Sequence, residues 1–371
     1  MQSFDFHPTT RVIYGEGALA QLGDLVGESG GKRILVVTDP GIVGAGIVDR
    51  ALAPLQGASQ DIFVFDGTGE NPTTDHVDAG VAFAKAQGDV DLIMGLGGGS
   101  AMDCAKAINF ILTNGGQMVD YRGMGHAKQP LLPSIGVPTT AGTGSEAQSY
   151  ALIAQADTHE KMACGDLTAR FHSVILDPSL TESVPRSVTA ATGIDAIAHA
   201  LESYVSTRRN AVSCLFAREA WRLLGSGFER VIRDPSDAEA RAEMLVGAHF
   251  AGSAIENSML GAAHACANPL TAQYGIPHGV AVGVMLGAVM RFNAETKGPL
   301  YEGLGVGAMA LADRVDEMKD LAGLPAHLRD LGVEKEKLPG LAKGATAEWT
   351  GTFNPRAAGE EDFLALYESV F

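Results

Sequence analysis

The sequence has few of the features that place a protein outside the cell or in a membrane. Its four cysteines, Cys104, Cys164, Cys214 and Cys266, lie far apart and form no CxxC pair, which is typical of reduced, buried thiols in a cytosolic protein. The chain does not open with a positive segment followed by an apolar run, so we expect no secretory signal. The longest apolar stretch, Val280–Met290, is too short to cross a bilayer as a helix. These absences predict a cytoplasmic protein.

Basic residues are also scarce relative to acidic ones. The chain has 27 Lys and Arg against 44 Asp and Glu, which leaves a net charge of −17. Such an acidic surface repels phosphate backbones and anionic lipid headgroups, so we expect neither nucleic acid nor a membrane as a partner. The apolar fraction of 46% and the length of 371 residues indicate a packed globular protein of about two domains.

The apolar pattern changes character about halfway along the chain. In the first half, short β-rich runs alternate with amphipathic segments, which is typical of a parallel sheet covered by helices on both faces. From Ser183 onward the periodicity is mostly helical. We therefore predict a Rossmann-like α/β dinucleotide-binding domain over residues 1–180 and an all-helical domain over residues 181–371. The predicted strands are Arg33–Thr38, Asp61–Phe65, Asp91–Leu96, Ser134–Val137 and Ser173–Leu176.

Two loops rich in small residues follow predicted strands. Gly95–Ser100 (GLGGGS) opens a helix, where glycine lets the backbone approach a phosphate and the helix N-terminus supplies N–H donors. Thr139–Ser145 (TTAGTGS) offers hydroxyl groups after the next strand. Each loop alone is also typical of an ordinary turn. Two of them at the carboxyl ends of parallel strands favour a ligand site, because ligands of open α/β sheets bind at that edge.

Asp39 ends the first strong predicted strand. An acidic side chain there accepts hydrogen bonds from ribose hydroxyls and repels a 2′-phosphate, which favours NAD over NADP. The same residue is equally suited to cap the helix that begins after Pro40. Because this acid precedes the glycine-rich loop instead of following it, the usual order of the GxGxxG fingerprint is absent.

Four candidate metal ligands lie on predicted apolar helices. Asp195 and His199 are four residues apart and share one helix face, although that pair alone fits a buried Asp–His hydrogen bond equally well. His264 and His278 lie in two further apolar segments. Buried carboxylate and imidazole groups need partners. One carboxylate and three imidazoles together predict a site for Fe²⁺ or Zn²⁺.

Long motifs occur in a fixed order through the whole chain. They are VIYGEGAL (Val12–Leu19), GGGS with a following acid (Gly97–Ser100, Asp103), PTTAGTGSE (Pro138–Glu146), TAATGIDAIAHALESYVS (Thr189–Ser206), GxxHAxxxPL (Gly261–Leu270), PHG (Pro277–Gly279) and NPR (Asn354–Arg356). On these motifs the chain resembles the iron-containing (group III) alcohol dehydrogenases over nearly its whole length. The resemblance implies a dehydroquinate-synthase-like fold, and the opening segment resembles the family's first hairpin.

The resemblance also implies a set of site residues. Asp195, His199, His264 and His278 are expected to bind one divalent metal, which is usually iron and sometimes zinc. A homodimer is the expected assembly. The residues expected to contact NAD are Asp39, Asn71, Gly97, Gly98, Gly99, Ser100, Asp103, Thr139, Thr140, Thr143 and Lys161. Lys161 lies in a polar stretch (HEKMAC), which is typical of a solvated loop.

One position departs from the family pattern. Many members have a second histidine four residues after the third ligand, and this chain has Asn268 there. Asparagine forms hydrogen bonds but does not shuttle a proton. A proton relay through this position is therefore not expected, and the substrate preference is expected to differ from that of ethanol- and diol-oxidising members.

The predicted reaction is the metal-dependent interconversion of a small alcohol and its aldehyde, with hydride passing from the alkoxide to the nicotinamide. The metal lowers the pKa of the alcohol as it does that of bound water, from ~16 toward ~7, so no general base is assigned. Alternatives with the same fold are a glycerol dehydrogenase and a maleylacetate reductase, and the complete Asp/His/His/His set favours the alcohol dehydrogenase. A dehydroquinate-synthase-like lyase would need Lys and Arg around the metal, which the ligand segments lack. A non-catalytic NAD-binding module is a third alternative, which the intact ligands disfavour and Asn268 leaves open.

Overall fold

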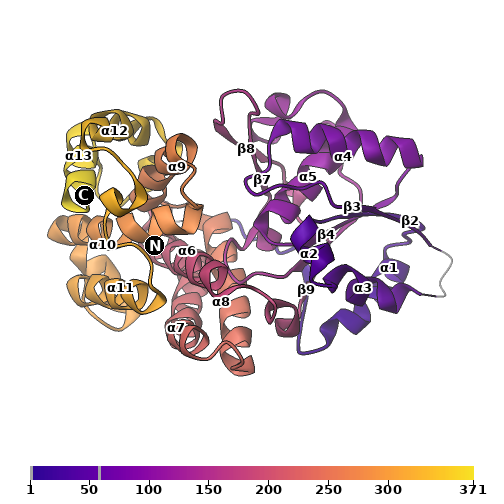
Figure 1. Ribbon diagram of the computed structural model, residues 1–371, viewed down its shortest axis with the longest axis horizontal. Helices are drawn as coiled ribbons and strands as arrows, with labels where there is room; N and C mark the ends of the chain where they lie inside the picture. The colour runs from indigo at the N-terminus through magenta and orange to yellow at the C-terminus, as the bar shows by residue number, and fades with distance from the viewer. Residues whose placement is uncertain (1–2, 57–59) are drawn as a thin grey trace. The chain divides into compact units, whose positions relative to one another are not determined.

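The computed structural model describes residues 3–56 and 60–371, which form two compact units. The first unit comprises residues 7–140 and 145–183 and is an α/β structure. The second comprises residues 184–371, together with Ala141–Gly144 and the segment up to Phe6, and is helical. Figure 1 shows the α/β unit in indigo to magenta and the helical unit mostly in pink to yellow. The predicted fold class is confirmed.

The α/β unit is built on a six-stranded sheet in the order β1-β9-β6-β4-β2-β3. Every neighbouring pair in this sheet is parallel, as the register of Val36 opposite both Val64 and Met94 illustrates. The strands are β1 (Arg11–Tyr14), β2 (Arg33–Val37), β3 (Asp61–Phe65), β4 (Leu92–Gly97), β6 (Ser134–Pro138) and β9 (Ser173–Leu176).

Helices cover both faces of this sheet because its central strands are apolar on both sides. On one face, α1 and α3 pack against alternate strand residues such as Ile34, Val36 and Met94. The intervening Leu35 and Ile93 are fully buried toward the other face, where α5 packs against β2 and β4, and α4 against β3. The helices of this unit are α1 (Leu22–Glu28), α2 (Pro40–Gly44), α3 (Ile47–Leu52), α4 (Thr74–Gln87) and α5 (Gly99–Asn114).

Two features of this unit differ from the sequence-based expectations. A small second sheet contains the antiparallel pair β7 (Tyr150–Ala154) and β8 (Lys161–Gly165), with β5 (Gly123–Met124) parallel to β8. Lys161 therefore begins a strand and does not lie in a polar loop. The expected opening hairpin is wrong, because β1 is an edge strand that pairs in parallel with β9, far along the chain.

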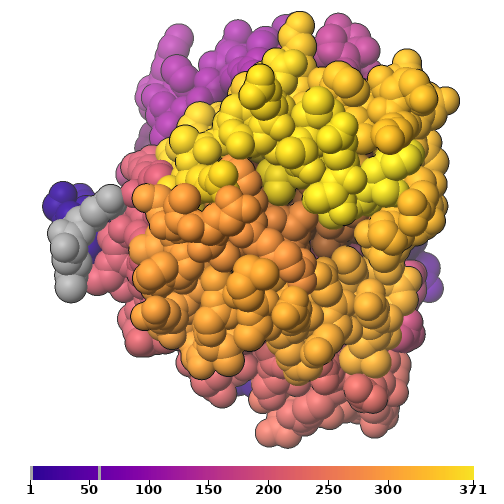
Figure 2. Space-filling view, turned by 90° about the vertical axis from the view of Figure 1, so that its left-hand side faces the viewer, coloured from indigo at the N-terminus to yellow at the C-terminus, as the bar shows by residue number. Residues whose placement is uncertain are grey.

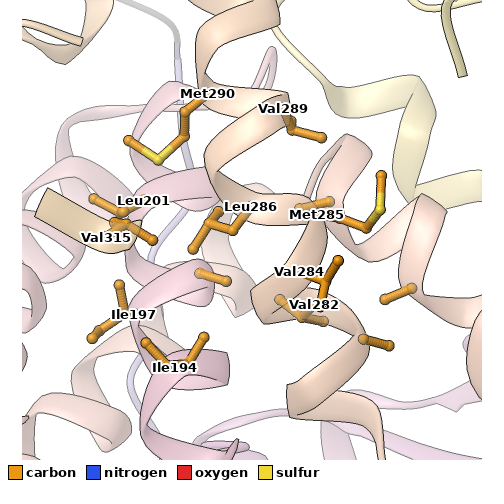
Figure 3. Packing of buried hydrophobic residues seen from close by; sticks show 14 of the residues in the cluster. Ile194, Ile197, Leu201, Val282, Val284, Met285, Leu286, Val289, Met290 and Val315 are labelled. Carbon is orange, nitrogen blue, oxygen red and sulfur yellow. The ribbon is translucent and has the colours of Figure 1, made fainter. Parts of the chain in front are cut away.

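The helical unit packs its longest helices around a common apolar core. Figure 3 shows Ile194, Ile197 and Leu201 of α6 facing Leu286 of α10 and Val315 of α11. The helices are α6 (Arg186–Val205), α7 (Ala211–Arg233), α8 (Ala238–Ser258), α9 (Ala262–Tyr274), α10 (His278–Lys297), α11 (Ala308–Ala322), α12 (Leu338–Ala347) and α13 (Glu360–Ser369). Within the described part of the chain, no helix has both the length and the apolar character needed to span a membrane.

A cavity of about 670 Å³ lies between α10, α11 and α13. It is on the face of the helical unit shown in Figure 2, between the orange α10 and α11 and the yellow α13. Two arginines of its lining are paired with acidic residues, Arg291 with Asp316 and Arg356 with Glu295. None of the predicted metal ligands lines this cavity, so it is separate from the candidate site.

Candidate metal centre and cofactor-binding edge

The candidate metal centre is built on α6, which is buried on nearly all sides from Gly193 to Val205. Its apolar stripe, with Ile194 and Ile197, packs into the helical core. The opposite stripe carries Asp195 and His199 one turn apart. The helix therefore forms because one stripe buries apolar surface, and the same packing fixes the direction of the two polar side chains.

The three predicted histidine ligands converge on one carboxylate oxygen of the fourth, Asp195. The Nε2 atoms of His264, His199 and His278 lie 3.3, 3.4 and 3.9 Å from Asp195 Oδ1. His264 is in the first turn of α9, and His278 is the first residue of α10. The His199 and His264 rings are stacked, with centroids 4.8 Å apart. Three helices thus bring together residues that are up to 83 positions apart in the chain.

The residues fit a divalent metal. Asp195 Oδ1 and His264 Nε2 are buried, and neither makes a hydrogen bond, although they are 3.3 Å apart. Buried polar atoms without a partner are costly, and a shared cation would satisfy both. Donors bound at about 2.1 Å around a tetrahedral ion are ~3.4 Å from one another, close to the spacing seen between the nearest pairs. The donor set of three imidazoles and one carboxylate suits iron and zinc.

The ionisation of the centre follows from burial and from its neighbours. Burial alone would raise the pKa of Asp195, but the imidazoles around it, His199 first, hold that pKa below its usual range. Burial lowers the pKa of His199 to about 4, which leaves it neutral. Burial acts in the same direction on His264, but Glu202 and Asp195 outweigh it and raise its pKa to about 9. A bound divalent cation would replace that proton between the two carboxylates.

Sequence reasoning did not single out Glu202, which contacts a ligand directly. Its Oε2 accepts a hydrogen bond from Nδ1 of His264, and its Oε1 accepts one of 2.7 Å from the backbone N–H of Ala263. Glu202 follows Asp195 by seven residues and His199 by three, so it lies on the same stripe of α6. That spacing was the signal in the sequence that would have found it.

A buried polar network continues beyond Glu202. Asn354 of the NPR motif accepts a hydrogen bond from the Ala262 N–H at 3.3 Å and exchanges hydrogen bonds with Asn293. Gly261 leaves room for this arrangement, because a Cβ there would lie 2.9 Å from Glu202 Oε1 and 3.0 Å from Asn354 Oδ1. The GxxHA motif therefore combines a ligand with the glycine that makes space for the groups behind it.

The predicted cofactor loops of the α/β unit lie at the carboxyl edge of neighbouring strands. Thr139 and Thr140 follow β6, Gly97–Ser100 ends β4 and opens α5, Asp39 follows β2, and Asn71 lies in the loop after β3. Because β6, β4, β2 and β3 are adjacent in the sheet, these loops line one edge in that order. This is the edge at which ligands of open α/β sheets bind.

The glycine-rich loop suits a phosphate group. Gly98 occupies the N-cap position of α5 with no side chain capping the helix, so the first N–H groups of a 16-residue helix are available to an anion. A Cβ on Gly98 would lie 3.3 Å from Thr140 Oγ1, so glycine keeps the two loops close together. The residues present therefore fit a dinucleotide.

Asp39 has the helix-capping role that was one of the two alternatives for this residue. Its Oδ1 accepts hydrogen bonds from the N–H groups of Gly41 and Ile42 and caps α2. Its Oδ2 faces Gly97, where a Cβ would lie only 3.3 Å away. One oxygen thus fixes the side chain, while the other lies beside the glycine-rich loop.

Three predicted cofactor residues are placed differently from the rest. Asp103 is buried in α5, where it accepts a hydrogen bond from Ser145 and lies 3.9 Å from Lys106. Lys161, at the start of β8, lies close enough for its charge to oppose the burial that raises the Asp103 pKa. Thr143 belongs to the helical unit. The charge of Lys161 thus acts on Asp103, and Thr143 is grouped with the unit that carries the proposed metal ligands.

Asn268 lies one helical turn after His264 on α9, on the same face. Its amide donates a hydrogen bond of 2.8 Å to the carboxylate of Glu348. The position at which the resemblance leads us to expect a histidine is thus occupied here by an amide paired with a carboxylate.

The comparisons with known proteins agree with this geometry. A family model described as iron-containing alcohol dehydrogenase matches residues 8–178, and one for the C-terminal part of the Fe-containing alcohol dehydrogenase family matches residues 189–371. The chain belongs to the iron-containing alcohol dehydrogenase family. The resemblance read from the sequence motifs is confirmed.

Individual members of the iron-containing alcohol dehydrogenase family match over almost the full length. Alcohol dehydrogenase 4 of Schizosaccharomyces pombe is 36% identical over 367 residues, 96% of this chain and 87% of that protein. The crystal structure of 1,3-propanediol oxidoreductase matches with a TM-score of 0.94 and 32% identity over 100% of both chains. Sulfoacetaldehyde reductase from Bifidobacterium kashiwanohense, solved with NAD⁺, matches with a TM-score of 0.90 and 27% identity over 100% of this chain and 99% of that one. These relatives support an alcohol or aldehyde oxidoreductase.

Proposed function

We propose that this protein is a divalent metal-dependent, NAD-linked alcohol dehydrogenase that interconverts a small alcohol and its aldehyde. The observation that carries the proposal is the convergence of three imidazole nitrogens on Asp195 Oδ1, at 3.3 to 3.9 Å, with Asp195, His199 and His264 buried and His278 22% exposed. The family supports iron as the metal, and zinc suits the same donors.

The chain's own residues divide the work. Asp195, His199, His264 and His278 would hold the metal, which when bound supplies a Lewis acid that lowers the pKa of the alcohol. The N–H groups at the start of α5 would bind the pyrophosphate of the dinucleotide, and Asp39 would bind the adenosine ribose. NAD, when bound, would supply the acceptor for the hydride of the alcohol carbon, and no side chain is assigned as a nucleophile.

NAD is proposed over NADP for two reasons. A carboxylate at Asp39 would repel a 2′-phosphate, and one oxygen of this group is held in place by the start of α2. The NAD⁺ complex of the sulfoacetaldehyde reductase, whose fold matches this one throughout, gives independent support.

We also propose a cytoplasmic homodimer with no nucleic acid or membrane partner. All four cysteines are free, as in proteins of reducing compartments. The edge strand β1 exposes Val12 and Tyr14, at 43% and 55% of their surface, and exposed edge strands readily pair with a second chain. Light scattering after gel filtration should give twice the mass of one chain.

The deciding experiment removes the metal and then adds back Fe²⁺ or Zn²⁺ while NAD reduction is followed on a panel of short alcohols and diols. We expect metal-dependent turnover in the wild type and none in His264→Ala. The same panel, with aldehydes and NADH, tests the reverse direction. Tight binding of metal and NAD without turnover of any alcohol or aldehyde would overturn the proposal.

A further inference from the structure

The carboxylate of Glu202 lies directly behind one of the metal ligands. It is 5% exposed, and both of its oxygens are engaged, one by the Nδ1–H of His264 and the other by the N–H of Ala263 at the start of α9. A negative charge is favoured at this place, because the first N–H groups of a helix carry partial positive charge. No other function of this side chain is needed to explain its position.

The hydrogen bond from His264 fixes which ring nitrogen faces the metal centre. When Nδ1 carries the proton that is donated to Glu202, Nε2 has a free lone pair. That nitrogen lies 3.3 Å from Asp195 Oδ1, where a cation would be shared. Ligating histidines in metal sites are commonly oriented in this way by a carboxylate.

Glu202 also completes the charge balance of a buried centre. Asp195 supplies one negative charge and the three imidazoles supply none when they ligate a metal. The two positive charges of a divalent cation are then matched only if Glu202 is counted as well. An uncompensated charge in the interior is costly, so this second carboxylate favours retention of the metal.

We propose that Glu202 is the positioning residue of the metal centre: it holds His264 as the Nδ1–H tautomer and supplies the second negative charge that retains a divalent cation. The inference rests on the proposed function, because it assumes that the four ligands bind a metal. Gly261 is part of the same arrangement, because a Cβ at this position would lie too close to the Glu202 carboxylate.

The test measures metal affinity and histidine tautomer instead of turnover. Metal-free wild type, Glu202→Gln and Glu229→Gln are titrated with Zn²⁺ in competition with a chromophoric chelator. Glu229→Gln is the matched control, because it removes the same charge from α7, where Glu229 pairs with Arg314 away from the ligands. We expect Glu202→Gln to raise the Zn²⁺ dissociation constant about 10- to 100-fold, and the control to leave it unchanged.

The tautomer is read in the unmodified protein, so the proposal can be tested even if Glu202→Gln does not fold. ¹⁵N spectra of the Zn²⁺-loaded wild type should show His264 protonated at Nδ1 and bound through Nε2. The opposite tautomer, or an affinity of Glu202→Gln within about a factor of two of the wild type, would overturn the role of Glu202 while the proposed function stands. A wild type that takes up no divalent metal would overturn both.

Discussion

Asp195 is an anion in the interior, surrounded by imidazoles, and its Oδ1 lacks a hydrogen bond. Any ligand that binds only the folded state stabilises it, and a metal at 100 times its dissociation constant adds ~2.7 kcal/mol. We therefore expect saturating Zn²⁺ to stabilise the wild type by about this amount and Asp195→Asn by almost nothing. Thermal unfolding of chelator-treated and metal-loaded samples measures both. An equal gain in the two proteins would place the metal elsewhere.

Asn268 gives a second prediction for a single residue. A histidine introduced there would lie one turn from His264 and would titrate near its ordinary pKa of ~6.5, which asparagine does not. We expect the pH profile of kcat/KM for Asn268→His to gain an ionisation in this range that the wild type and Asn268→Gln lack. Identical profiles for all three proteins would show that this position does not exchange protons with the reacting groups.

The sequence predicts the four candidate donor residues, and the same helical spacing would have placed Glu202 on their helix face, but it does not predict the hydrogen bond between Glu202 and His264. Asp195 and His199 are recognised as candidate ligands because their spacing places them on one helix face. Two more histidines in apolar segments are the other two candidates. Glu202 shares that helix face, but its partner His264 is 62 positions away, and hydrogen bonds of this range leave no periodic signal. Asp39 shows the same limit, because only the structure shows that one of its oxygens caps α2 while the other lies beside Gly97.

At the level of helices, close backbone contact explains the PHG motif. A Cβ on Gly279 would lie 2.0 Å from the carbonyl oxygen of Ala191, so α10 begins directly against α6. We expect Gly279→Ala to destabilise the protein by about 3 kcal/mol or more and to weaken metal binding, because backbone must move beside His278. Gly340→Ala is the control, and we expect it to change the stability in the opposite direction. A Cβ on Gly340 in α12 would meet open space, so this variant should stabilise the protein by ~0.5–1 kcal/mol.

Urea unfolding of the metal-free proteins gives both values. If Gly279→Ala were as stable as the wild type, the contact between α10 and α6 would have to be looser than the structure has it. The metal affinity of the same variant then shows whether His278 moves with its helix.

The large sheet was predictable because each of its central strands is a continuous apolar run buried on both faces, and that pattern is local. The small sheet was not. β8 begins with Lys161 after a polar turn, and β5 is two residues long, so neither carries an apolar signature. Their pairing joins Gly123 to Cys164 and depends on the fold around them. The pairing of β1 could not be predicted either. An apolar strand near the start of a chain does not reveal which strand it will pair with, or whether the pair is parallel.

On the scale of the whole molecule, the two chemical tasks are assigned to different units. All four proposed metal ligands and Glu202 belong to the helical unit, and the glycine-rich loop with Asp39 belongs to the α/β unit. The loop from Pro138 to Glu146 is divided, with Ala141–Gly144 in the helical unit and its two ends in the other. Each binding task can therefore be removed by a substitution within one unit.

This separation predicts that metal and cofactor binding fail independently in the absence of substrate. Gly98→Val would place a branched side chain at the N-cap of α5, and we expect it to weaken NAD binding at least about tenfold, or ~1.4 kcal/mol, with unchanged Zn²⁺ affinity. His264→Ala should abolish Zn²⁺ binding and leave NAD affinity as in the wild type. Calorimetric titration of both variants with both ligands measures the four affinities. If His264→Ala lost as much NAD affinity as Gly98→Val, the assignment of metal and NAD binding to separate units would be contradicted. A substitution in the helical unit would then weaken cofactor binding at the carboxyl edge of the sheet.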